Sequence, residues 1–133
     1  VIAMLAQLAS IDEKEFEISV LTKLKKTVKE IQKCVTSSLG NDWSILIDTI
    51  ERVQGLTCDV CIFLIPNAFQ NMSLEKPLFN VATSRALRHT IIIADKSIVS
   101  YPFADKQVSA YLKRLNEEYS FEVEPSSILK LLP

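Results

Sequence analysis

The sequence predicts an α/β fold in which a mostly parallel sheet carries helices on both faces. Two observations lead to this prediction: short apolar segments of strand length recur along the chain, and segments with helical spacing of apolar residues lie between them. Strands buried on both faces are usually parallel and connect through right-handed crossovers. Ligands in such folds bind at the carboxyl ends of the strands, so we expect a functional site there.

The first half of the chain reads as strand, helix and strand. Residues 16–21 mix apolar and β-branched residues over a strand's length, and Thr22 offers a hydroxyl as a helix N-cap. The helix that follows is amphipathic, with lysines on its outer face and an apolar stripe formed by Leu24, Val28, Ile31 and Val35. Gly40 is expected to end this helix, and residues 44–49 form the second predicted strand.

The second half repeats this alternation. Residues 60–65 and 90–95 are continuous apolar runs typical of buried strands, and residues 74–87 between them have helical character. We interpret His89, the one histidine, as a residue at the end of that helix. A further helix is predicted after Pro102, where the apolar positions are Val108, Tyr111, Leu112 and Leu115.

Composition indicates one globular domain, spanning 1–133. The chain has 133 residues, of which 48% are hydrophobic, and a formal net charge of -1, so no global basic field attracts nucleic acid and any such contact must be local. The opening apolar residues 1–6 are too few for a membrane span and lack the basic leader of a signal peptide. We expect a fragment of a longer protein, with no membrane partner.

The three cysteines predict reduced thiols in a cytoplasmic protein, because their number is odd and no secretory signal is recognised. Cys58 and Cys61 form a CxxC motif, which could be a redox pair or half of a zinc site. Because a strand's period of two places positions three apart on opposite faces, we interpret both as buried thiols and predict no metal site.

Two loops carry motifs that together resemble a known family. The segment 48–60 has a threonine, Thr49, then a Gln54-Gly55 turn and a buried strand, and is similar to motif V of superfamily 1 helicases. The segment 79–86 reads Phe-Asn-Val-Ala-Thr-Ser-Arg-Ala and resembles motif VI of the same family. A fainter match to motif IV lies at 20–28. The order and spacing of the motifs support the resemblance.

The resemblance implies the C-terminal part of the second motor domain of a UvrD/Upf-like superfamily 1 DNA or RNA helicase. Its fold would be a RecA-like (P-loop NTPase-like) three-layer sandwich. The intact protein would hydrolyse ATP with Mg2+ and move along single-stranded nucleic acid, DNA more than RNA. The partners implied are that strand and the N-terminal helicase domain of the same polypeptide, which would hold most of the nucleotide.

The motif positions imply roles for particular residues. Arg85 matches the motif VI arginine that reaches the γ-phosphate, and its planar fork suits paired phosphate oxygens. Nucleotide-binding positions are Gln54, Gly55, Thr57, Lys25 and Asn80, the last expected to support Arg85. Thr49 matches a position that contacts a strand phosphate, and Arg52 joins it as a nucleic-acid contact. Without the motifs, each residue has an ordinary structural role such as a surface ion pair or a cap.

Three departures from the family pattern keep a second hypothesis open. Thr57 stands where a glutamate is usual, Leu24 replaces an aromatic residue that stacks on adenine, and Lys25 replaces an arginine. The alternative is a degenerate, non-catalytic helicase-like domain with an interaction or regulatory role. The chain also lacks a GxxxxGK[ST] loop to cradle phosphates, so by itself it is expected to be inactive as an enzyme.

Overall fold

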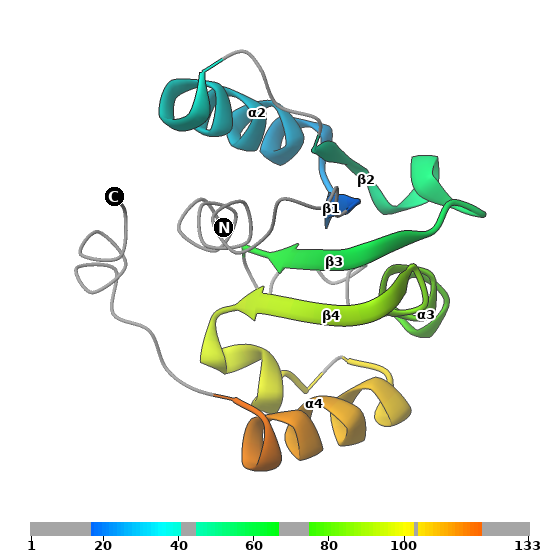
Figure 1. Cartoon of the computed structure of the whole chain (residues 1–133). Coiled ribbons are helices and arrows are strands. Elements are labelled where there is room, and N and C mark those ends of the chain that lie inside the picture. The colour runs from blue at the N-terminus through cyan, green and yellow to red at the C-terminus, as the bar shows by residue number, and fades with distance from the viewer. Residues whose placement is uncertain (1–16, 41–44, 67–74, 103, 121–133) are drawn as a thin grey trace.

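The computed structural model describes residues 17–40, 45–66, 75–102 and 104–120. A four-stranded parallel sheet with the strand order β2-β1-β3-β4 forms its centre (Figure 1). The strands are β1 (Ile18–Thr22), β2 (Leu46–Thr49), β3 (Cys58–Ile65) and β4 (Ala86–Ala94). Both continuous apolar runs form parallel strands, as their lack of alternation predicts. β3 is largely buried inside the sheet, whereas β4 lies at an edge of the described sheet and its apolar run is only half-buried.

Helices cover both faces of the sheet, so the α/β, three-layer, RecA-like fold predicted for this chain is confirmed. The helices are α2 (Lys25–Leu39), α3 (Lys76–Thr83) and α4 (Lys106–Glu118), with two short 3-10 helices, η1 (Ile50–Val53) and η3 (Lys96–Ser100). Figure 1 shows α2 and α4 on opposite sides of the strands. Each face has its own core, and neighbouring β1 residues divide between the two: Val20 packs with α2, whereas Leu21 packs with α3 and α4.

Because the four strands are parallel, the sheet has one side where all strands begin and one where all end. We call these the amino edge and the carboxyl edge. At the carboxyl edge Thr22 lies beside Thr49. At the amino edge Cys58, the first residue of β3, lies beside Ala86, the first residue of β4. Loops and helix ends at these two edges hold all the residues that the sequence marks for function.

The start of α2 differs from the sequence prediction, whereas its end agrees. The N-cap is Leu24, whose apolar side chain makes no capping bond. Thr22 instead belongs to β1 and is fully buried. The predicted Thr22 cap is therefore wrong. Gly40 ends the helix with φ 77° and donates its N–H to the carbonyl of Thr36 at 2.9 Å, a left-handed ending that favours glycine.

The boundary between α3 and β4 also differs. α3 ends at Thr83 and β4 begins at Ala86, so the predicted helix to residue 87 is too long and His89 lies in a strand, not at a helix end. Leu87, Arg88 and His89 are exposed, so hydrophobicity does not mark this part of the strand. Pairing with β3 extends β4 over these residues.

Two further properties concern the described part of the chain. No helix there is both long enough and apolar enough to cross a membrane. Likewise, the described residues contain no cluster of three or more His, Cys, Asp or Glu side chains able to hold a metal ion.

Candidate functional site

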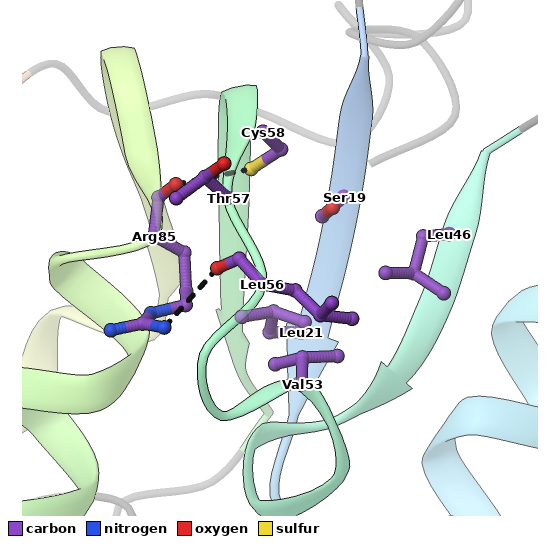
Figure 2. A pocket seen from close by; sticks show the side chains of 8 residues that line it. All are labelled: Ser19, Leu21, Leu46, Val53, Leu56, Thr57, Cys58 and Arg85. Carbon is purple, nitrogen blue, oxygen red and sulfur yellow. Dashed lines mark hydrogen bonds between the residues drawn. The ribbon is translucent and has the colours of Figure 1, made fainter.

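Arg85 lies in the turn between α3 and β4 and connects the two motif-bearing loops at the amino edge. Its Nη1 donates to the carbonyl of Leu56 at 3.1 Å, as Figure 2 shows. Its Nε donates to the carbonyl of Val81 at 3.0 Å and its Nη2 to Oγ of Ser84 at 2.9 Å. These bonds fix the direction of a half-buried guanidinium, which otherwise has many rotamers.

The loop that receives Arg85 is a tight turn built on glycine. Leu56 donates its N–H to the carbonyl of Val53 at 3.0 Å, and the two residues between them are Gln54 (φ -57°, ψ 125°) and Gly55 (φ 89°). This is type II turn geometry, which requires a positive φ at its third residue. The sharp Gln54-Gly55 turn is therefore confirmed. Open space surrounds Gly55, so backbone conformation alone requires glycine there.

A second set of bonds joins the same loops through the start of β3. Cys58 donates its N–H to the carbonyl of Arg85 at 3.0 Å, and its Sγ lies 3.7 Å from that oxygen. Sγ of Cys61 donates to the carbonyl of Ala82 at 3.5 Å. The start of β3 is thus bonded to the carbonyl of Arg85 and to that of Ala82 at the end of α3.

The prediction that Cys58 and Cys61 occupy opposite faces is wrong. The register between β3 and β4 shifts between Cys58 and Val60, and this β-bulge turns both thiols to the face that packs against α3. Both are buried free thiols, as predicted. Burial, helped by the neighbouring Cys58 thiol and opposed by the charge of Arg85, raises the pKa of Cys61 to about 12.

These environments predict that one of the three cysteines reacts in the native protein. Cys34 is exposed, whereas Cys58 and Cys61 are buried, and thiolate is the reactive form. With a thiol reagent at neutral pH, we expect fast modification of Cys34 alone and modification of all three after denaturation. Fast modification of Cys61 in the folded protein, read by peptide mass, would contradict the packing.

The raised pKa of Cys61 also makes the free energy of unfolding depend on pH. The neutral thiol should contribute fully to this free energy below pH ~8.5, and its contribution should fall progressively up to about pH 12.

A small hollow lies beside Arg85 at the amino edge. Its volume is about 10 Å³, and it is lined by Ser19, Leu21, Leu46, Val53, Leu56, Thr57, Cys58 and Arg85 (Figure 2). Such a volume holds about one water molecule, whereas drug-sized ligands occupy pockets of roughly 300 Å³ or more. The hollow therefore cannot enclose a nucleotide.

The structure brings most of the predicted nucleotide residues to this edge. Gln54, Gly55 and Thr57 are exposed in the loop that Arg85 contacts. Asn80 is exposed on α3, and its carbonyl accepts the N–H of Ser84 at 3.1 Å. Among the described residues, the guanidinium of Arg85 bonds to Leu56, Val81 and Ser84, so the expected support from Asn80 is indirect.

The other predicted residues lie away from Arg85. Lys25 begins α2 at the carboxyl edge, beside the end of β1. Thr49 ends β2 at the same edge and is only 4% exposed, which leaves little of its hydroxyl for a ligand. Arg52 is exposed in η1, with its Nε 3.8 Å from Oδ2 of Asp48. The predicted site residues thus lie at two edges of the sheet. The prediction of one site at the carboxyl ends of the strands is therefore wrong for Arg85 and its neighbours.

Sequence reasoning missed the partners that hold Arg85. Leu56 and Val81 contribute backbone carbonyls, to which their side-chain types give no clue. Cys58 and Cys61 resembled a metal or redox motif and act instead as donors to the backbone around Arg85.

The parallel sheet between helical layers and the family match place the chain in the class of P-loop NTPase-like domains of the RecA type. A family model described as "AAA domain" matches residues 1–97, which is most of the chain. The chain belongs to this family of helicase-like AAA domains. A search of curated proteins finds none that matches it.

Proposed function

We propose that this chain is the C-terminal motor domain of an ATP-dependent superfamily 1 helicase or translocase. Its contribution to ATP hydrolysis is Arg85, acting on a nucleotide held between this domain and the N-terminal helicase domain of the same polypeptide. The observation that carries the proposal is the fixed guanidinium of Arg85, bonded to both motif-bearing loops beside a hollow of about 10 Å³.

The chemistry of Arg85 fits a phosphate oxygen. Its three bonds use three of the five N–H groups of a guanidinium, so two remain for an anion. A prepositioned cation stabilises the negative charge that develops during phosphoryl transfer, and it does so without reorganising at the moment of reaction. Gly55 and Gln54 beside it offer backbone and amide groups to the same ligand.

The need for a second domain follows from what this chain contains. Its two glycines, Gly40 and Gly55, cannot form the GxxxxGK[ST] loop that cradles phosphates. The hollow of about 10 Å³ cannot surround a nucleotide either. ATP and its Mg2+ would therefore be bound mainly by the N-terminal domain, where the metal neutralises phosphate charge, while Arg85, Gln54, Gly55, Thr57 and Asn80 contact the nucleotide from this side.

The carboxyl edge supplies the proposed contacts with single-stranded DNA. The family resemblance assigned Lys25 to the nucleotide, but Lys25 begins α2 at this edge, away from Arg85, so we reassign it to the strand. Lys25 is exposed at the first turn of α2, and Arg52 is exposed in η1. Both offer cationic groups to backbone phosphates, which dominate the affinity of proteins for nucleic acid. Thr49, between them, positions the end of β2 and exposes only a small part of its surface to a strand.

The test is ATP hydrolysis by the full-length protein with and without single-stranded DNA. A motor couples strand binding to hydrolysis, so we expect the turnover rate to rise when oligodeoxythymidine is added and the stimulation to weaken with salt. Binding of the strand without any hydrolysis would instead support the alternative, a non-catalytic helicase-like domain. The observation that favours this alternative is Leu24, which is 41% exposed where the family usually has an aromatic ring.

A further inference from the structure

The outer surface of α2 has an unusual concentration of positive charge. The helix carries four lysines, Lys25, Lys26, Lys29 and Lys33, all exposed, against one acidic residue, Glu30. Among the described residues, none of the four lysines lies within ion-pair distance of a carboxylate. In a chain with a net charge of -1, this is a local basic surface.

One contact shows which way this surface faces. Nε2 of Gln32 donates to the carbonyl of Ile47 at 3.5 Å, so the flank of α2 that contains Gln32 lies over β2. With 3.6 residues per turn, Lys25, Lys29 and Lys33 lie about 20°, 60° and 100° around the helix from Gln32, away from the buried stripe. These three lysines, which we call the lysine flank, therefore form one row on the outer surface of α2 that begins on its β2 side.

The lysine flank begins at the carboxyl edge. α2 starts directly after β1, and its first turn has no capping side chain and no acidic residue, which leaves the positive end of the helix uncompensated. Oγ1 of Thr22, the last residue of β1, is buried without a hydrogen-bond partner among the described residues. The flank then runs back along α2 towards the amino edge.

We infer that the lysine flank binds the backbone phosphates of a single-stranded DNA that continues from the carboxyl edge along α2. This inference rests on the proposed function, which places the strand at that edge. Two residues of the lysine flank, Lys29 and Lys33, lie outside every motif on which the family resemblance depends.

The spacing of the lysines suits the successive phosphates of one nucleic-acid strand. Lysines four positions apart rise about 6 Å along a helix. The proposed function places a single strand at the carboxyl edge, where this row of charges begins. Lysine binds phosphate as a point charge and makes no contact that distinguishes bases, so binding along the lysine flank should not depend on base sequence.

The test measures the affinity of the full-length protein for oligodeoxythymidines of increasing length, by fluorescence anisotropy at several salt concentrations. The variant is Lys29→Gln with Lys33→Gln, two exposed positions where the substitution keeps the helix. We expect it to bind the longest oligonucleotide more weakly, on the order of tenfold, and to lower the salt slope by about 1.4, the value for two phosphate contacts. Short oligonucleotides that cover only the carboxyl edge should bind both proteins equally.

A matched control removes the same charge elsewhere. Lys106→Gln with Lys113→Gln changes two exposed lysines of α4 and should leave affinity and salt slope unchanged. Equal losses in both variants, or wild-type binding of all lengths by the α2 variant, would overturn the inference while leaving the proposed function intact. Failure of the unaltered protein to bind any oligonucleotide would overturn both.

Discussion

Replacing Arg85 with alanine is expected to lower the DNA-stimulated turnover of ATP by about a thousandfold, comparable to the loss of other trans-acting arginines. This corresponds to about 4 kcal/mol of transition-state stabilisation. The guanidinium is already fixed by Leu56, Val81 and Ser84, so in the proposed function its charge would be in position before the phosphoryl group reacts. The measurement is kcat of the full-length protein at saturating ATP and DNA.

Two controls separate chemistry from folding in this experiment. Arg85→Lys keeps the charge but loses the fork that bonds Leu56 and Ser84, so most of the loss should persist. Arg88→Ala removes a more exposed arginine, whose Nε lies 3.5 Å from Oδ1 of Asp59, and should keep turnover within a few fold of the original. The role given to Arg85 is wrong if Arg85→Ala retains turnover in a protein shown to be folded.

The second large effect is expected on stability. Phe79 in α3 is 3% exposed, and its ring centroid lies 5.9 Å from that of Phe63 and 5.7 Å from that of Tyr111. Phe79→Ala would remove this link between α3, the sheet and α4. We expect the free energy of unfolding to fall by about 3–5 kcal/mol, which denaturant titration of the full-length protein would measure if this domain unfolds as a separate transition.

A pair of comparison variants makes this prediction specific. Phe79→Leu keeps most of the buried volume and should cost clearly less than the alanine variant. Tyr119→Ala changes a residue that is 73% exposed and should shift stability by about 0.5 kcal/mol or less. Equal losses for Phe79→Ala and Tyr119→Ala would show that the aromatic cluster does not hold the layers together.

The fold could be predicted from the sequence because its central elements depend on local signals. The apolar runs of β3 and β4 are too short for helices and lack alternation, which indicates buried parallel strands. Val28, Ile31 and Val35 repeat at helical spacing, and the structure buries all three against the sheet. Gly40 could be assigned because a left-handed ending of a helix favours glycine.

The boundaries that were missed depend on partners distant in sequence. The first residues of β4 are exposed and resemble a continuing helix, and only pairing of Ala86 with Cys58 makes them a strand. The register shift between Cys58 and Val60 interrupts the regular alternation of side chains in β3, so the two thiols share a face that simple alternation does not predict. Thr22 seemed a cap because its hydroxyl suits one, yet β1 extends to include it.

The candidate site was predictable in its residues but not in its arrangement. Motif order identified Arg85 and the Gln54-Gly55 turn, and the structure joins them through the carbonyl of Leu56. Strand alternation alone suggested a site at the carboxyl ends of strands. α3 runs back to the amino ends before the turn that carries Arg85, and so places the arginine at the opposite edge from Lys25.

The most direct measurement of the role of Arg85 is the affinity of the full-length protein for ADP with aluminium fluoride, which imitates the phosphoryl group in transfer, relative to ADP alone. A residue that acts on the transition state should contribute to the affinity for ADP with aluminium fluoride but not to the affinity for ADP alone. We predict that Arg85→Ala binds ADP as the unaltered protein does but loses most of the extra affinity for the aluminium fluoride complex. An unchanged ratio of the two affinities would contradict the assignment of Arg85 to phosphoryl transfer.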